Sequence, residues 1–96
     1  MITTKERATL RGFANNIPDL VFVGKEGVNE NVIKQVVDNL QAHELIKIKV
    51  QQNCSLTAYE VCNLLVDSTQ AEPISVVGSK IVLYKKTTKK GFKHYL

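Results

Sequence analysis

The sequence lacks long apolar runs and is poor in cysteine. None of its 96 residues falls in an apolar stretch close to the roughly eighteen residues needed to cross a membrane, so no membrane partner is expected. The first six residues lack the hydrophobic core of a signal peptide and are typical of a helix start. Cys54 and Cys62 are the only cysteines, without C-x-x-C spacing or neighbouring histidines. This usage favours reduced thiols in a cytoplasmic protein over a disulfide.

Catalytic and metal-binding motifs are also missing. His43 and His94 stand far apart in the sequence and share no metal-ligand spacing. There is no P-loop and no nucleophile elbow. The pair Gly24 and Gly27 lacks the preceding G-x that would complete a dinucleotide-binding fingerprint. We therefore expect neither an enzyme nor a bound cofactor or metal ion.

Positive charge is in excess at one end of the chain. Residues 79–96 carry six lysines and no acid, a balance of +6, whereas the remaining residues carry seven bases and nine acids, a balance of −2. This asymmetry is typical of a protein with a polyanionic partner, although a solvated charged tail would give the same balance. The length predicts one domain, which we place at residues 1–86. A basic tail at 87–96 is expected to be partly disordered unless Phe92 or Tyr95 docks.

Hydrophobic periodicity, caps and turn residues predict seven elements. Thr3 and Thr57 each precede a glutamate by three residues, the spacing of a capping box at a helix start. Gly78 followed by Ser79 is the signature of a type II′ turn between two antiparallel strands. The expected helices are 4–16, 29–42 and 57–69, and the expected strands are 20–23, 45–50, 74–77 and 80–85.

The apolar pattern also predicts which side chains face the core. The first strand has four apolar residues in a row, which is typical of a strand buried on both faces, so Phe22 is expected in the core. In the second strand apolar residues alternate with Lys47 and Lys49, which places both lysines on the face opposite the core. These two lysines either keep a half-exposed strand soluble or follow a phosphate backbone. In the third helix, Cys62 and Leu64 are expected to pack inward.

The predicted order of elements, αβαβαββ, defines an α/β fold. Its two strand–helix–strand units imply right-handed crossovers between parallel neighbours, and the last hairpin adds an antiparallel edge. We expect a compact two-layer-type domain with a four-stranded mixed sheet, in which the second and third helices cover one face. The sequence leaves open whether the first helix packs at an edge of the sheet or on the other face.

The turn Gly24-Lys25-Glu26-Gly27 joins the first strand to the second helix. Its two glycines let the chain turn and let an anion approach backbone N–H groups without a Cβ in the way. The following helix start adds further N–H groups and its positive dipole end, and Lys25 adds a positive charge. Four residues are a weak motif, so a plain strand-to-helix turn is the alternative.

Several segments, taken in order, extend this pattern across most of the chain. They are Leu10-Arg11, Phe13-Ala14, and residues 23–28, 30–33, 44–50 and 76–85. Together they resemble the YhbY-like family of small CRM-domain proteins (chloroplast RNA splicing and ribosome maturation). The resemblance spans about residues 3–86 and is far more specific than the turn alone.

The resemblance implies an αβαβαββ RNA-binding domain similar to the C-terminal domain of translation initiation factor 3. Stand-alone bacterial members are associated with precursors of the large ribosomal subunit, and plant relatives act in group II intron splicing. The family's GxxG loop, here Gly24, Lys25, Glu26 and Gly27, is the expected RNA contact, much as in KH domains. Two residues depart from the family pattern, because Glu26 places an acid in the loop and Ser79 stands where a base often follows the hairpin glycine.

We therefore expect a monomeric RNA-binding protein that contacts ribosomal RNA in precursors of the 50S subunit, with no role for DNA. A basic surface is expected to widen the contact made by the loop. Its residues are Arg7, Arg11, Lys47, Lys49 and Lys80. Because the one aromatic residue near the loop, Phe22, is expected in the core, recognition should depend on the RNA backbone more than on bases. The alternative is a small regulatory or adaptor domain that binds a protein, and a phosphorylated small molecule at the glycine turn is a third option.

Overall fold

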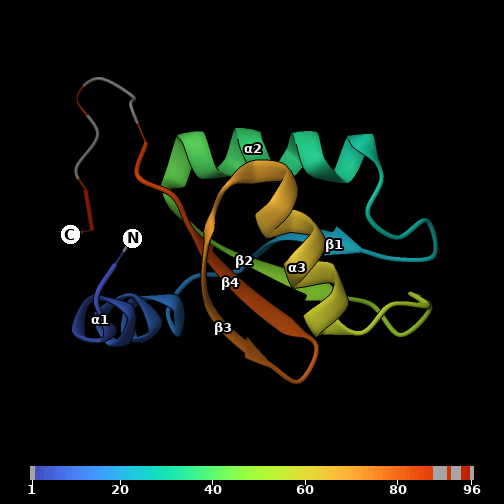
Figure 1. The fold of residues 1–96 in the computed structure, drawn as a ribbon, viewed down its shortest axis with the longest axis horizontal. Helices are drawn as coiled ribbons and strands as arrows, with labels where there is room; N and C mark the ends of the chain where they lie inside the picture. Colours follow the sequence, from blue (N-terminus) through green and yellow to red (C-terminus); the bar gives the residue numbers. More distant parts are fainter. Residues whose placement is uncertain (1, 88–90, 92–93, 96) are drawn as a thin grey trace.

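The computed structural model describes residues 2–87, 91, 94 and 95, and its elements follow the predicted order (Figure 1). The helices are α1 (Thr4–Ala14), α2 (Glu30–His43) and α3 (Ala58–Thr69). The strands are β1 (Asp19–Val23), β2 (Leu45–Val50), β3 (Glu72–Val77) and β4 (Lys80–Tyr84). Each predicted boundary is confirmed to within two residues. None of the helices among these residues is long and apolar enough to cross a membrane.

Each helix starts at a side chain that accepts a backbone N–H. The hydroxyls of Thr3 and Thr57 each accept the N–H of the glutamate three residues later, and each glutamate accepts the N–H of its threonine. Both predicted capping boxes are therefore confirmed. At α2, Oδ1 of Asn29 accepts the N–H of Val32 at 2.9 Å. These bonds fix the helix starts, because the first N–H groups of a helix have no partner within it.

The four strands form one mixed sheet in the order β1-β2-β4-β3. β1 and β2 are parallel neighbours, as predicted. The expectation that β3 also neighbours β2 is wrong, because β4 lies between them and pairs antiparallel with both. Residues 81–84 of β4 are all buried, and a central strand can bury both of its faces where an edge strand cannot. The turn that joins β3 to β4 has a positive φ at Gly78 and not at Ser79, as a type II′ turn requires.

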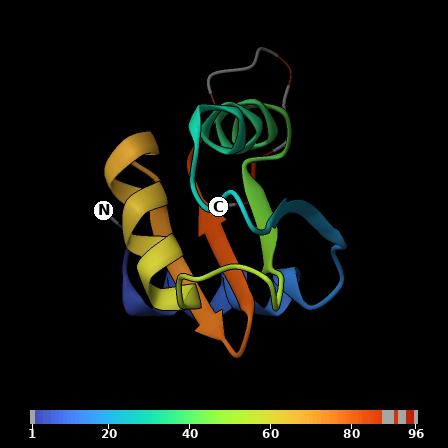
Figure 2. The same ribbon diagram turned by 90° about the vertical axis from the view of Figure 1, so that its right-hand side faces the viewer.

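Helices α2 and α3 cover one face of the sheet, and α1 packs on the other (Figure 2). The larger core lies beneath α2 and α3 and includes Val36, Ile48, Leu65 and Ile81. A smaller cluster joins α1 to β2, β3 and β4, and its buried members are Leu10, Ala14, Leu45, Ile74, Val82 and Tyr84. A helix of 11 residues covers only part of this second face.

Two predicted core positions are wrong. Phe22 is 52% exposed, because its neighbours Val21 and Val23 occupy the buried face of β1 and successive residues of a strand point to opposite faces. α1 packs on the other three strands, so the ring of Phe22 stays open to solvent. Leu64 is also half-exposed, since the fully buried Leu65 takes the inward position of α3 beside it.

The end of the chain folds back towards α1 and the end of α2. The Tyr95 ring packs edge-on against Phe13 with 5.3 Å between ring centroids. The Tyr95 N–H donates to the buried carboxylate of Glu44 at 2.9 Å. The sequence predicts a partly disordered tail unless Phe92 or Tyr95 docks, and Tyr95 does dock. Within the predicted tail, residues 88–90, 92, 93 and 96 lie outside the described residues, so partial disorder there stays a prediction.

Candidate nucleic-acid interface

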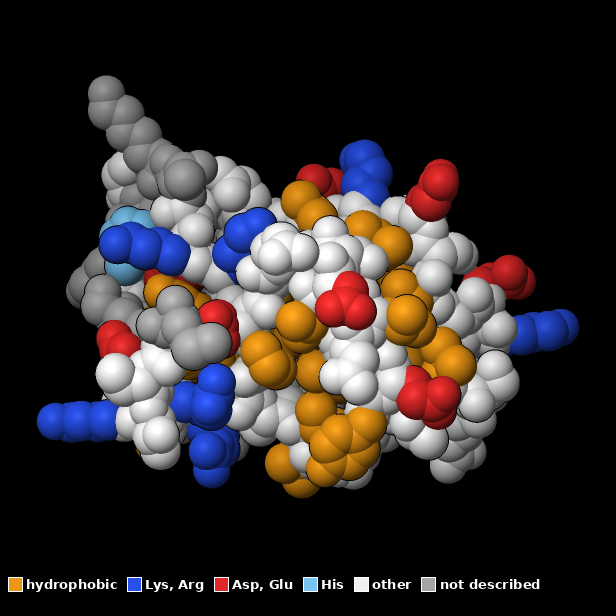
Figure 3. All heavy atoms as spheres, in the orientation of Figure 1, with side chains coloured by type: hydrophobic (Ala, Val, Ile, Leu, Met, Phe, Trp, Pro, Cys, Tyr) orange, Lys and Arg blue, Asp and Glu red, His pale blue; other side chains and the backbone are white. Residues whose placement is uncertain are grey.

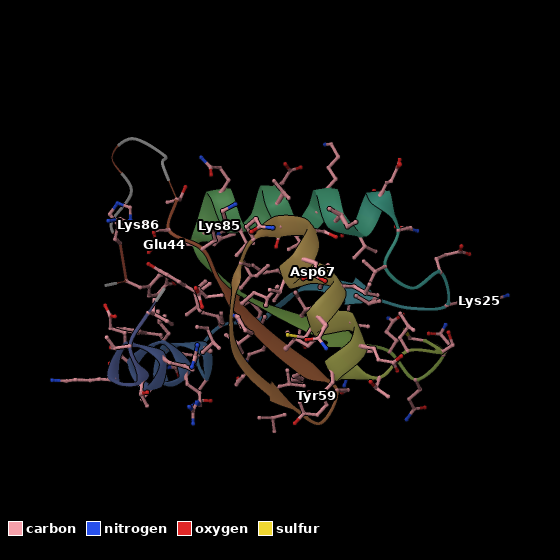
Figure 4. All side chains as sticks on the ribbon, in the orientation of Figure 1. Lys25, Glu44, Tyr59, Asp67, Lys85 and Lys86 are labelled. Carbon is pink, nitrogen blue, oxygen red and sulfur yellow. The ribbon has the colours of Figure 1, made fainter. Side chains whose placement is uncertain are left out.

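A hydrogen-bonded turn stands between β1 and α2. The N–H of Gly27 donates to the carbonyl oxygen of Gly24 at 2.9 Å, which closes a β-turn with Lys25 and Glu26 at its tip. Both tip residues are exposed, and Figure 4 shows Lys25 pointing away from the body at one end of the molecule. Neither tip residue has a positive φ, which indicates a type I turn, whose last position favours glycine.

The two glycines of the turn serve different purposes. Gly27 has a φ of 66°, in the left-handed region that favours glycine. Gly24 has no such backbone requirement. A Cβ at Gly24 would lie 2.6 Å from Oε1 of Gln51 and 3.3 Å from Oδ1 of Asn53. Gly24 therefore lets the loop after β2 lie against the turn, and the flexible Gln51 side chain could move aside for a larger residue.

The turn offers two backbone donors to a ligand. The N–H groups of Lys25 and Glu26 donate to no acceptor in the described part of the chain, whereas the N–H of Gly27 is used within the turn. The helix α2 starts only at Glu30, and the side chain of Asn29 already caps it. An anion at the turn would thus meet two N–H groups and the charge of Lys25, with the helix start contributing less than the sequence suggested.

Lysines from β2 and β4 lie side by side on the sheet face that α1 partly covers. The register pairs Phe22 with Lys49, Lys49 with Lys80, and Lys80 with Val77. These four residues, which we call the open row, cross all four strands. Phe22 and Val77 are 52% and 71% exposed, and the side chain of Lys80 is 47% exposed. The prediction that Lys47 and Lys49 face away from the main core is confirmed.

Lys47 stands one row closer to α1 than the open row. Together with Arg11 of α1 and Lys80 of β4, it lines a depression of about 240 Å³. The structure thus brings three predicted cations from three elements together. The ammonium of Lys80 also lies 3.1 Å from the carboxylate of Asp19. Such a partly exposed ion pair contributes little free energy, so a phosphate can compete with Asp19 for Lys80.

Arg7 lies apart from this group of cations. Its guanidinium is 3.8 Å from the carboxylate of Glu72 on β3. Arg7 also lines a hollow with Tyr59 and Pro73, on the β3 edge of the molecule. Although Arg7 and Arg11 are one helical turn apart, they therefore face different surfaces.

A buried carboxylate holds the end of the molecule opposite the turn (Figure 4). Glu44 is fully buried, and it accepts the N–H groups of Thr87 and Tyr95 at 3.0 and 2.9 Å. Nδ1 of His94 lies 2.6 Å from the same carboxylate. Burial raises the pKa of the Glu44 carboxyl, but these hydrogen bonds outweigh burial and lower the pKa below its ordinary value. The only sequence signal for this role is an acid placed directly between a helix and an apolar strand.

We call the part of the sheet that carries Lys47, Lys49 and Lys80 the lysine face. The turn and the lysine face offer a ligand positive charge and N–H donors. The described residues contain no group of three or more His, Cys, Asp or Glu side chains placed to hold a metal ion. Cys54 and Cys62 are free thiols, and burial raises the pKa of Cys62, which disfavours its reactive thiolate. The arrangement suits non-covalent binding of a chain that carries phosphates.

Comparison with known proteins gives the family. The CRS1 / YhbY (CRM) domain matches residues 2–85. The chain belongs to the CRM-domain family. Probable RNA-binding protein YqeI of Bacillus subtilis is 40% identical to it over 87 residues, 91% of each chain. Probable RNA-binding protein MJ0652 of Methanocaldococcus jannaschii is 39% identical over 97 residues, 99% of this chain and 70% of the relative.

A solved structure extends the likeness to the fold. The solution structure of SAV1595 from Staphylococcus aureus is 40% identical in sequence and matches with a TM-score of 0.79 over 94% of both chains. The family predicted from the sequence segments is thereby confirmed, and so is the α/β fold of this CRM domain. These matches assign no role to the turn or the lysine face, so the predicted contact residues stay predictions.

Proposed function

We propose that this CRM-domain protein binds RNA. The observation that carries the proposal is the meeting of Arg11, Lys47 and Lys80 in one depression, with Lys49 beside them in the sheet. Phosphates are drawn to such a face because each lysine or arginine they meet releases counterions. The names of the relatives YqeI and MJ0652 as probable RNA-binding proteins support the same conclusion.

The RNA we propose is ribosomal RNA in precursors of the 50S subunit, bound in the cytoplasm by a monomer. The resemblance of the turn and strands to the YhbY-like family supports this choice. The protein would catalyse no reaction and would act by holding a segment of RNA during assembly. Because Glu26 offsets the charge of Lys25 at the turn, the sheet lysines should carry more of the electrostatic attraction than the turn does.

Sedimentation of cell extract tests the proposal. The protein should migrate with large-subunit precursors, and brief ribonuclease treatment or high salt should release it, because the contacts run through phosphates. A variant with Lys34→Ala, which removes an exposed lysine of α2, should migrate like the parent. If neither ribonuclease nor high salt changed the migration of the protein, RNA binding would be contradicted.

A protein-binding adaptor is the second candidate, and one surface favours it. Figure 3 shows hydrophobic side chains gathered over α3 and β3. Tyr59 is 68% exposed there and lines a hollow of about 330 Å³ with Pro73 and Val76. An adaptor would migrate with a protein complex that survives ribonuclease, so the same sedimentation experiment separates the two functions.

A further inference from the structure

The second face of the sheet is only partly covered by α1. α1 packs over the start of β2 and the end of β4. The open row crosses the opposite ends of these strands, where Lys80 and Val77 border the depression that Arg11 of α1 also lines. The result is a surface where an aromatic ring, two lysines and a valine stand next to one another on four adjacent strands.

Among the residues of the open row, Phe22 has the surroundings that most suggest a binding role. A single exposed apolar side chain is common and needs no explanation by itself. The position of Phe22 is different, because Lys49 stands beside it on the neighbouring strand, about 5 Å away across the sheet. The turn begins two residues later at Gly24, with Lys25 at its tip. A flat apolar ring, a positive charge and the donors of the turn therefore follow one another along the end of β1.

We propose that the open row binds an unpaired stretch of RNA, with one base stacked on the ring of Phe22 and the adjoining phosphates at Lys49 and Lys80. The inference rests on the proposed function and deepens it, because it names the form of RNA. Every base has a flat face that stacks on an aromatic ring, and an unpaired base can be splayed out to reach one. In an RNA duplex the base faces are stacked within the helix, so the ring of Phe22 cannot reach them.

The charge of the surface decides between RNA and protein as its occupant. Lys49 and Lys80 belong to the row and Lys47 adjoins it, and Asp19 is the acid that pairs with Lys80 there. An apolar protein segment would remove water from these lysines without replacing it, which is costly. A nucleotide chain supplies phosphates to them as well as a base to the ring.

The hollow beside α3 lacks this combination. It also exposes an aromatic ring, that of Tyr59, but Arg7 is the one cation among the described residues that line it, whereas three lysines lie in or beside the open row. Tyr59 therefore provides a matched control, an exposed aromatic side chain that should not contribute to RNA binding.

The test is fluorescence anisotropy with two labelled RNAs of equal length, one unpaired and one fully paired. Phe22→Ala should weaken binding of the unpaired RNA about tenfold, which corresponds to about 1.4 kcal/mol. The dependence on salt should stay as in the parent, because the ring contacts no phosphate. Binding of the paired RNA should be unchanged, Phe22→Tyr should bind like the parent, and Tyr59→Ala should have no effect on either RNA.

The outcomes separate this inference from the proposed function. Circular dichroism checks that Phe22→Ala folds, and Phe22→Leu, which keeps apolar bulk without a flat ring, should show the same selective loss. If the parent binds unpaired RNA and the Phe22 variants bind it equally well, or lose both RNAs equally, the stacking site is wrong while RNA binding stands. If the parent binds neither RNA, the proposed function fails and this inference with it.

Discussion

Gly24 and Gly27 look equivalent in the sequence, but they have different roles in the folded chain. Gly27 must have a positive φ of 66° to let the chain leave the turn towards α2. Gly24 instead makes room for the side chains of Gln51 and Asn53. The sequence correctly predicts a turn here, because two glycines follow an apolar run. It cannot separate the two roles, because the loop that presses on Gly24 comes from a distant part of the chain.

Gly27→Ala should lower the free energy of unfolding by about 1–2 kcal/mol, the cost of placing a Cβ in the left-handed region. The new Cβ would lie 3.8 Å from Cδ1 of Leu56, an ordinary contact, so the loss comes from the backbone alone. Urea unfolding measures it. Gly12→Ala is the matched control, because a Cβ there meets nothing within 4 Å and alanine favours the interior of α1 by about 1 kcal/mol. Equal stability of Gly27→Ala and the parent would contradict the backbone role.

Phe22 shows where apolar patterning fails as a guide. Four apolar residues in a row predict a strand buried on both faces. β1 is instead an edge strand, and the helix on its second face packs over the other strands. The placement of α1 decides the exposure of Phe22, and that placement is what the sequence left open.

The helices and strands themselves could be read from local signals. Capping side chains set each helix start, and the alternation in β2 sets which residues face the core. The order of strands needed more information, because a short hairpin permits β4 on either side of β3. The apolar run at residues 81–84, buried on both faces in the centre of the sheet, decides that order.

The joint between α2 and β2 consists of one residue, Glu44. It has a φ of 69°, which is uncommon outside glycine, and its carbonyl oxygen accepts the N–H of Lys85 at 2.9 Å. Its side chain joins the segment after β4 to this joint through Thr87 and Tyr95. Three stretches of chain thus depend on one buried carboxylate.

Glu44→Gln should lower the free energy of unfolding at pH 7 by about 1–3 kcal/mol, because an amide cannot replace a carboxylate that accepts several N–H groups. The lowered pKa means that the carboxylate stabilises the fold above the ordinary value of 4.5 and that this contribution is lost as the pH falls through the lower folded pKa. The difference in the free energy of unfolding between parent and variant should therefore become smaller below about pH 4.5. Urea unfolding across that range checks it.

Asp67→Asn is the control for this prediction. Asp67 is an exposed carboxylate on α3 (Figure 4). Its substitution should change stability by no more than about 0.5 kcal/mol, as is usual for surface positions. If the free energies of unfolding of Glu44→Gln and the parent differed by the same amount from pH 7 down to strongly acidic pH, the role of the ionised carboxylate would be contradicted.

The distribution of charge over the whole molecule differs from what the sequence suggests. The molecule is 36 Å long, and Figure 4 places Lys25 at one end, Lys86 towards the other, and Lys85 between them. Of the lysines in residues 79–96, Lys80 belongs to the open row. Lys85 instead donates to the carbonyl oxygen of Thr69 at the end of α3. The described lysines of the basic end, Lys80, Lys85 and Lys86, therefore form no single patch, and Lys80 lies instead with Lys47 and Lys49 on the sheet.

The central claim is that RNA binds to the sheet lysines, and a salt titration of binding to ribosomal RNA tests it most directly. The parent should show a steep fall of affinity with salt, by about 0.7 in the logarithmic slope for each phosphate contact to unpaired RNA. Lys49→Ala should weaken binding and make the slope shallower by about one contact. Lys34→Ala, which removes an equal charge from α2, should match the parent. A flat slope for the parent, or the same loss in both variants, would contradict the account.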